Sequence, residues 1–373
     1  MSSITVGINL LWLVPGQVGG SEESTLASVR ALAALSPPDL DLRLFVLDPL
    51  LEAHPDLPDL LPVEVLPRSG RSRAARIAAE STWLSTRTRG VDLVHHAGGT
   101  APPRRAAPYV LTLHDLQPLE RDATHGRLKR AYLGVAAPRS VHSAATTVVP
   151  SEFVRTTVLE HMRVTPDKVV VVPHGVDRHP HPTPREDLVA RYGLEGPVVL
   201  YPAISYPHKN HAVLVDAFAR IAATHPESVL VLPGGPGACE PALRAQIHAL
   251  GLSARVLRPG RIPAADVAGL YELATVVAVP SRDEGFGLPA AEAMAYGAPL
   301  VVADATALPE VVGDAGLRVA PDDEAGWAGA LDRILGDAAL RARLGAAGAA
   351  RAASFTWPAN AAALADVYRH ALP

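Results

Sequence analysis

Cysteine is almost absent from the 373-residue sequence, which has Cys239 alone, so a disulfide scaffold and a thiolate metal cluster are both excluded. No apolar run approaches the roughly 20 residues that a membrane-spanning helix needs. The first residues lack the charged start and long apolar stretch of a secretory signal peptide. The net charge is only −4 at pH 7, too small for a generic nucleic-acid binder. We therefore expect a cytoplasmic protein that does not bind nucleic acid.

Short apolar runs alternate with helical stretches along most of the chain, which predicts parallel sheets with crossover helices. At one domain per roughly 150 residues, the length favours two domains. The segment Asp177–Arg185 contains three prolines in five residues, which indicates a stiff linker. We therefore predict domains at 1–180 and 181–355, followed by a helical tail.

The expected strands fall into two series, one on each side of the linker. Val169–Val172 is continuously apolar, so we expect that strand to be covered on both faces. A first helix is predicted over Glu22–Leu35, opened by Ser21. The expected strands are Ile4–Val14, Leu42–Leu47, Val63–Leu66, Val91–His95, Tyr109–Leu113, Ala145–Val148, Val169–Val172, Val198–Tyr201, Ser228–Leu232, Arg255–Leu257, Thr275–Val279 and Leu300–Val302, and the expected helices of the second half are Asn210–Thr224, Glu240–Leu250, Pro263–Leu273 and Pro289–Tyr296.

The most informative motif is a glycine-containing turn between a predicted strand and a helix. Its glycines allow a ligand to approach the backbone closely, and the helix N-terminus favours an anion such as phosphate. Glu284 precedes the turn and Glu292 lies one turn into the helix, so one carboxylate can reach each end of a ligand. Carboxylates accept hydrogen bonds from vicinal hydroxyls, which indicates a sugar and a ribose. The turn has the sequence Ser281-Arg282-Asp283-Glu284-Gly285-Phe286-Gly287-Leu288-Pro289.

This segment resembles the signature of retaining glycosyltransferases of family 4 with the GT-B fold, and the resemblance covers essentially the whole chain. It implies an α/β protein of two Rossmann-like domains whose parallel sheets face each other across a cleft, with a final helix at about 356–373 that packs back on the first domain. It also implies that Glu284 contacts the donor sugar and Glu292 the nucleotide ribose. Backbone N–H groups of Gly285, Phe286, Gly287 and Leu288 would meet sugar hydroxyls and phosphate.

A second segment, Tyr201–His211, follows the first strand of the second half and opens a helix. Lys209 can bring a positive charge to a diphosphate and stabilise the leaving group. The segment resembles the Lys-Asn helix start of the same family. It departs from the family where many members have an arginine, because Ala203 stands there, and His208 occupies the position of a second frequent arginine. We expect Lys209 and His208 on the donor diphosphate.

Two motifs of the first half point to the same chemistry. His114-Asp115 ends a predicted strand, where side chains of open parallel sheets reach a ligand. The pair resembles the family's His-Asp pair, which implies that His114 lies near the donor sugar and Asp115 on the acceptor side; a loop histidine with a capping aspartate is the alternative. The loop from Gly16 to Glu22 resembles the family's Gly-Gly loop, which assigns Gly19 and Gly20 to the donor and Glu22 to the acceptor.

Arg68–Arg89 has six arginines against one acid, Glu80. It is interpreted as a solvated helix face, and peripheral contact with a membrane or an anionic acceptor is the alternative. No metal is expected, because the histidines of His179-Pro180-His181 lie in the proline linker without a carboxylate set.

The function expected from this resemblance is transfer of a hexose-type sugar from a nucleoside-diphosphate sugar to a hydroxyl acceptor, with retention and without a cofactor or metal. His114, Lys209 and Glu284 are the expected catalytic residues. Two alternatives stay open. One is a nucleotide-sugar epimerase or phosphorylase-like enzyme of the same fold, and the other is a catalytically silent partner subunit.

Overall fold

The computed structural model describes residues 3–16, 19–116 and 127–372. The chain forms two compact units. Unit 1 comprises Met1–Gly175 and Trp357–Pro373, and unit 2 comprises Val176–Thr356. No helix of the described residues is long and apolar enough to cross a membrane.

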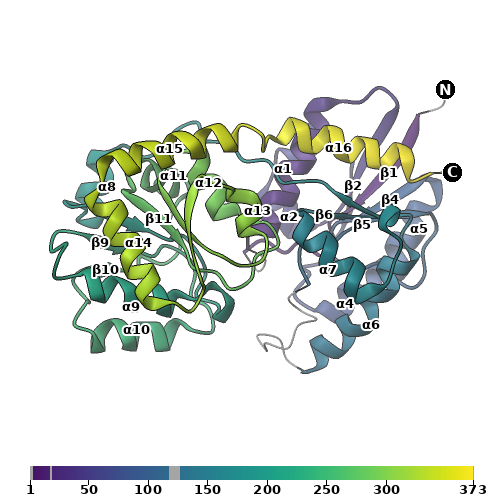
Figure 1. Cartoon of the computed structure of the whole chain (residues 1–373). Helices are drawn as coiled ribbons and strands as arrows, with labels where there is room; N and C mark the ends of the chain where they lie inside the picture. The colour runs from purple at the N-terminus through teal and green to yellow at the C-terminus, as the bar shows by residue number, and fades with distance from the viewer. Residues whose placement is uncertain (1–2, 17–18, 117–126, 373) are drawn as a thin grey trace. The chain divides into compact units, whose positions relative to one another are not determined.

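Unit 1 is built on a parallel seven-stranded sheet with the order β3-β2-β1-β4-β5-β6-β7 (Figure 1). The order reverses between β1 and β4, so their carboxyl ends form the switch point where ligands bind in open α/β sheets. The C-terminal helix α16 belongs to this unit and packs along α1. The elements of unit 1 are β1 (Ile4–Asn9), α1 (Gly20–Leu35), β2 (Leu40–Leu47), α2 (Asp48–Ala53), α3 (Leu57–Leu60), β3 (Val63–Leu66), α4 (Arg73–Ala79), a π-helical turn (Glu80–Leu84), α5 (Ser85–Arg87), a 3₁₀ turn (Thr88–Gly90), β4 (Leu93–His96), β5 (Tyr109–Thr112), α6 (Arg127–Ser143), β6 (Thr146–Val149), α7 (Glu152–Met162), a 3₁₀ turn (Pro166–Lys168), β7 (Val169–Val171) and α16 (Trp357–His370).

Unit 2 has a parallel six-stranded sheet with the order β10-β9-β8-β11-β12-β13, which again reverses at its centre. Its central strands β8, β11 and β12 are fully buried, as expected for strands covered by helices on both faces. The elements of unit 2 are α8 (Arg185–Tyr192), β8 (Val198–Leu200), a 3₁₀ turn (Pro207–Lys209), α9 (His211–Ile221), β9 (Val229–Val231), α10 (Glu240–Ala249), β10 (Val256–Leu257), α11 (Ala264–Leu273), β11 (Val276–Val279), α12 (Leu288–Ala295), β12 (Leu300–Ala303), α13 (Leu308–Val312), β13 (Gly316–Val319), α14 (Glu324–Gly336) and α15 (Ala338–Ala352).

Four details of the predicted elements are wrong. The first strand ends at Asn9, because the apolar residues that follow it are buried in a loop. Helix α1 begins at Gly20, so Ser21 lies inside it. Strand β7 is an edge strand with Val170 exposed, so it is not covered on both faces. Strand β13 was not predicted, because Gly316 and Arg318 interrupt its apolar residues.

The arginine-rich segment Arg68–Arg89 is not one amphipathic helix. It divides into α4, the π-helical turn, α5 and a 3₁₀ turn. Its one acid, Glu80, is buried at 8% exposure rather than displayed on a solvated face. The segment therefore combines an arginine-bearing surface with a buried carboxyl group.

Candidate active site

The glycine-containing turn of unit 2 connects β11 to α12. Gly287 has a φ of +92°, and a Cβ atom placed there would meet Leu308 Cδ2 at 2.6 Å. Only glycine fits this position, because the backbone is left-handed and the space is filled. Pro289 lies in the first turn of α12 and has no N–H, and the N–H groups of Ala290 and Ala291 donate to the Gly287 carbonyl. The turn therefore presents the positive end of a helix dipole to an anion.

Lys209 and Glu284 form an ion pair at this turn. The Lys209 Nζ to Glu284 Oε1 distance is 2.6 Å, and the two side chains are 19% and 10% exposed. The Tyr201 hydroxyl is within hydrogen-bond distance of the Lys209 carbonyl at 3.1 Å and of Ser281 Oγ at 2.7 Å. The lysine backbone is thus fixed to the strand end from which the glycine-containing turn starts. A cation and a carboxylate are therefore held side by side with little exposure to water.

Glu292 lies on α12, and one of its carboxylate oxygens, Oε2, accepts a hydrogen bond from the Tyr271 hydroxyl at 2.8 Å. The Tyr271 ring is stacked on Tyr296 with centroids 5.5 Å apart. The hydrogen bond from Tyr271 fixes the Glu292 carboxylate on the exposed side of the helix.

His208 stacks on Tyr206 with ring centroids 5.8 Å apart, immediately before Lys209. The phenyl ring of Phe286 is buried against Phe355, so this residue can offer only its backbone to a ligand.

In unit 1, His114 follows β5 and is held in one orientation. Its Nε2 lies 3.1 Å from the Ala97 carbonyl, so Nε2 carries the proton and donates it. Its buried Nδ1 has no hydrogen-bond partner among the described residues. Burial lowers the pKa of His114 to about 4, which keeps the imidazole neutral at pH 7. His114 therefore presents a hydrogen-bond acceptor that suits a ligand hydroxyl.

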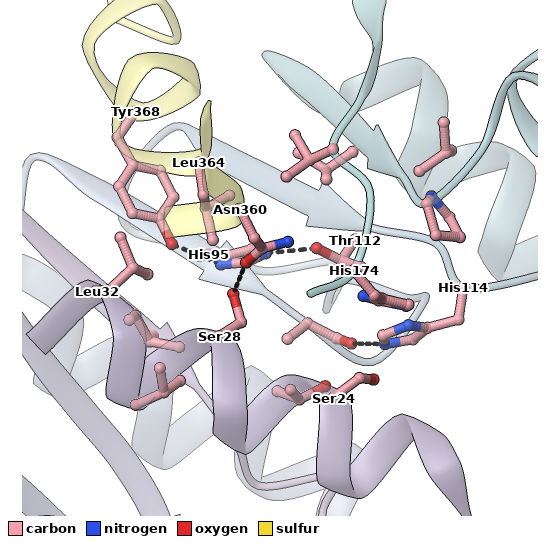
Figure 2. Close-up of a pocket in the computed structure, with 18 residues that line it drawn as sticks. Ser24, Ser28, Leu32, His95, Thr112, His114, His174, Asn360, Leu364 and Tyr368 are labelled. Atoms are coloured by element: carbon pink, nitrogen blue, oxygen red, sulfur yellow. Dashed lines mark hydrogen bonds between the residues drawn. The ribbon is translucent and has the colours of Figure 1, made fainter. Parts of the chain in front are cut away.

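A cavity of about 40 Å³, room for about three water molecules, lies beside His114 (Figure 2). His95 lies between the Tyr368 hydroxyl, 2.8 Å from its Nδ1, and Thr112 Oγ1, 2.7 Å from its Nε2. Burial lowers the pKa values of His95 and His174 to about 3. The cavity is therefore lined by apolar side chains together with neutral polar groups, and Tyr368 brings α16 into contact with the polar groups.

The remaining predicted residues of unit 1 belong to the loop before α1 and to the end of β5. Gly19 caps α1 and Gly20 is its first residue. Glu22 Oε2 accepts a hydrogen bond from the Gly16 N–H at 3.1 Å, so this carboxylate closes its own loop. Asp115 directly follows His114 and is half-buried. The intervening residues 17 and 18 lie outside the described residues, and the acceptor roles of Glu22 and Asp115 stay predictions.

Comparison with known proteins decides the family. A model of glycosyl transferases group 1 matches residues 186–351, and one of glycosyltransferase family 4 matches 18–179. A D-inositol 3-phosphate glycosyltransferase of Acidothermus cellulolyticus is 31% identical over 350 residues, covering 90% of this chain and 77% of the relative. The chain is a group 1 glycosyltransferase. Another such enzyme, from Stackebrandtia nassauensis, is 33% identical over 310 residues, covering 79% of this chain and 67% of the relative.

Solved structures of glycosyltransferases share the fold of this one. A sucrose-phosphate synthase of Thermosynechococcus elongatus has a TM-score of 0.77 at 22% identity, covering 98% of both chains. The Anabaena protein HepE, in complex with UDP and glucose, has a TM-score of 0.75 at 21% identity, covering 98% of this chain and 99% of that one. Together with the two parallel sheets, these neighbours confirm the predicted α/β GT-B fold.

The part of this glycosyltransferase that the structure describes contains no group of three or more histidine, cysteine or acidic side chains placed to hold a metal. The sequence does contain one Asp-x-Asp motif, Asp39-Leu40-Asp41, of the kind that can chelate a diphosphate-bound metal. Asp39 pairs with Arg369 at 2.7 Å, and Asp41 pairs with Arg43 at 2.9 Å. Both carboxylates lie at the amino end of β2, the end opposite to the one where such sheets bind ligands. This motif is therefore a pair of surface ion pairs.

Several residues of the glycosyltransferase site were not found from the sequence. Tyr271 stands in no motif, and Tyr201 and Ser281 stand in the two quoted segments without a predicted role, because the roles of all three depend on elements that fold against the predicted site. Unit 1 adds a hydrogen-bonded group at the carboxyl ends of β1 and β4. There Asn9 Nδ2 lies 2.9 Å from Glu80 Oε1 and 3.0 Å from His96 Nδ1.

Burial raises the pKa of Glu80 to about 7, from about 4.5 in an ordinary environment. Between pH 4.5 and about 7, Glu80 keeps its proton in the folded protein and loses it in the unfolded chain. The free energy of unfolding gains from this difference at low pH, and the gain is lost as the pH rises through 7. We expect Glu80→Gln, which is neutral at every pH, to raise the melting temperature at pH 8 and to leave it nearly unchanged at pH 5. Thermal unfolding at both pH values measures the difference.

Glu64→Gln is the matched control for Glu80→Gln, because Glu64 is 36% exposed and pairs with Arg87 at the surface. Its effect on the melting temperature is expected to be small at both pH values. A Glu80→Gln effect of the same size at pH 5 and pH 8 would show that the buried carboxyl group does not titrate in this range.

Proposed function

We propose that this chain transfers a hexose-type sugar from a nucleoside-diphosphate sugar to a hydroxyl acceptor, with retention of configuration and without a metal. Unit 2 binds the donor and unit 1 most of the acceptor. The observation that carries the proposal is the Lys209–Glu284 pair at the glycine-containing turn before α12. A cation, a carboxylate and the positive end of a helix dipole at one strand end match the phosphate and the sugar of such a donor.

Each group has a role in this proposal. Lys209 and the N-terminus of α12 offset the negative charge that develops on the departing diphosphate. Glu284 accepts hydrogen bonds from hydroxyls of the transferred sugar, and Glu292 accepts them from the ribose. His114 accepts a further sugar hydroxyl at Nδ1. In the free protein Lys209 and Glu284 neutralise each other. In this proposal the diphosphate of the donor takes the place of Glu284 beside Lys209, and the sugar takes the place of Lys209 beside Glu284.

The reaction proposed here breaks the bond between the anomeric carbon and the phosphate oxygen and forms a bond from the acceptor oxygen to that carbon on the same face. The acceptor proton passes to the departing phosphate oxygen, so no protein base is needed. His114 is neutral, and its proton is donated to the Ala97 carbonyl, so it orients the sugar rather than supplying a proton. Binding and orientation of the two substrates then supply most of the rate enhancement.

For the acceptor we propose a phosphorylated polyol, because the similar relatives are named D-inositol 3-phosphate glycosyltransferases. Unit 1 has arginines suited to such an anion. Arg73 lies over the Tyr132 ring at 5.5 Å, and Arg76 donates from Nη1 to the Trp12 carbonyl. Both guanidinium groups interact electrostatically with the buried Glu80, and in this proposal they also bind an acceptor phosphate.

Thermal unfolding with UDP, GDP, ADP and their sugars tests the donor site, with wild type beside Glu292→Ala. A nucleotide at 100 times its Kd stabilises the folded protein by about 2.7 kcal/mol, which raises the melting temperature by several degrees. We expect one base to produce this shift. Glu292→Ala should weaken its binding about 10- to 100-fold, because a hydrogen bond to a charged group is worth about 1.5–3 kcal/mol.

Glu324→Ala is the control for this measurement, because Glu324 pairs with Arg220 at the surface and is 44% exposed. A wild-type protein that no nucleotide stabilises would contradict the donor site and favour a silent partner subunit. Product analysis with donor but without acceptor separates the transferase from the epimerase alternative, since only an epimerase changes the configuration of the sugar.

A further inference from the structure

Thr306 has a backbone conformation that its side chain disfavours. It lies between β12 and α13 with a φ of +53°, in the left-handed region. The other described non-glycine residues with positive φ are Ser36, Arg163 and Asn210, so Thr306 is the β-branched member of this set. A β-branched residue at positive φ is strained and persists only where its surroundings hold it. The contacts around Thr306 must therefore hold this strained backbone in place.

The contacts of this segment are with Glu284 and Gly287. Thr306 Oγ1 accepts a hydrogen bond from the Glu284 N–H at 3.1 Å. The next residue, Ala307, donates its own N–H to the Glu284 carbonyl at 3.4 Å. Two consecutive residues thus hold both polar backbone groups of Glu284. Leu308 adds an apolar contact, because its side chain fills the space beside Gly287.

Glu284 has no regular structure of its own to hold it. It lies in the turn between β11 and α12, outside both elements. Its carboxylate is 10% exposed and faces Lys209. When a ligand replaces that partner, the segment from Thr306 to Leu308 is what fixes the backbone from which the carboxylate extends. A shift of this backbone by a fraction of an ångström would change the geometry that the sugar meets.

We propose that Thr306 is a positioning residue of the donor site, whose hydroxyl fixes the backbone of Glu284 so that its carboxylate meets the transferred sugar. The left-handed backbone at Thr306 is the conformation that brings the hydroxyl to the Glu284 N–H. Strain is therefore kept at this position for alignment rather than for stability. This inference rests on the proposed function, because it assigns the sugar to Glu284.

Three variants of the full chain separate the hydroxyl from the shape of the residue. Thr306→Ser keeps the hydroxyl, Thr306→Val keeps the branched shape without it, and Thr306→Gly removes both the hydroxyl and the strain. For each we would measure the melting temperature, the Kd of UDP, GDP and ADP, and the kcat and KM for the corresponding sugars with inositol 3-phosphate as acceptor. Release of nucleoside diphosphate measures turnover.

We expect Thr306→Ser to keep kcat within about threefold of wild type, and Thr306→Val and Thr306→Gly to lower it about tenfold or more. The Kd of the nucleoside diphosphate should not change, because Glu292 and Lys209 hold that part of the donor. The melting temperature of Thr306→Gly should equal or exceed that of wild type, since the strain is gone. Stability and turnover then move in opposite directions.

A merely structural role predicts a different result. If the melting temperature and kcat fell together in Thr306→Val and Thr306→Gly, or if Thr306→Val turned over like wild type, the positioning role would be wrong while the donor site stood. If the wild-type chain bound no nucleotide, the proposed function would fail, and the positioning role with it.

Discussion

Replacing Lys209 with alanine is expected to lower kcat about 100- to 1,000-fold, the usual cost of losing one group that stabilises developing charge. Its ammonium is the positive charge beside Glu284, and alanine removes that charge from the departing diphosphate of the proposed reaction. Lys209→Arg keeps a positive charge but changes its shape, so it should retain more turnover than alanine and less than wild type. Steady-state release of nucleoside diphosphate gives the comparison.

The Lys209 measurement needs two controls. Alanine leaves the Glu284 carboxylate at 10% exposure without its cation, which destabilises the protein, so assays belong well below the melting temperature of the variant. Lys168→Ala is the matched change in unit 1, where the Lys168 side chain donates to the His142 carbonyl. A Lys209→Ala enzyme that kept more than a tenth of wild-type kcat would remove the lysine from the proposed chemistry.

Trp327→Ala is expected to produce the largest loss of stability, about 3–5 kcal/mol. Trp327 lies on α14, is fully buried, and is the largest such side chain of the described residues. Its indole N–H donates to the Ala320 carbonyl at 3.1 Å, so alanine removes a hydrogen bond as well as the ring. Calorimetry or denaturant unfolding measures the loss, which corresponds to a fall in melting temperature of roughly 6–20 °C.

Trp83→Ala gives the comparison for Trp327→Ala, because Trp83 is only partly buried on the π-helical turn of unit 1. Trp83→Ala should lower the free energy of unfolding clearly less than Trp327→Ala does. Trp327→Phe retains most of the buried volume and should lie between the two. Equal losses for Trp327→Ala and Trp83→Ala would mean that the core of unit 2 relaxes around the missing ring.

The fold was predictable because most of the buried strands are short apolar runs between turn residues. The run Val276–Val279 is continuously apolar, which is typical of a strand covered on both faces. The wrong predictions concern buried residues outside any strand and an apolar residue exposed within one. The residues after Asn9 are buried without pairing as a strand, and Val170 is apolar at an exposed sheet edge. Strand β13 was not predicted because one face of it is polar, with Arg318 exposed.

The site was predictable where one segment carries its chemistry and not where several segments meet. Glu284, Glu292 and Lys209 stand in recognisable local sequences, and the structure brings Lys209 and Glu284 within 2.6 Å. The partner of Glu292, Tyr271, comes from another helix, so its role depends on packing. The orientation of His114 likewise depends on the Ala97 carbonyl, 17 residues earlier in the chain.

The return of α16 to unit 1 has a consequence for synthesis of the protein. Unit 2 is continuous in sequence, whereas unit 1 needs residues from Trp357 onward. On the ribosome, unit 2 has all its strands before α16 exists. Until then the apolar side of α1 lacks α16, and the ring of His95 lacks its hydrogen-bond partner Tyr368. Unit 1 is therefore the first to begin and the last to be completed. Its uncovered apolar surface must not aggregate while unit 2 folds.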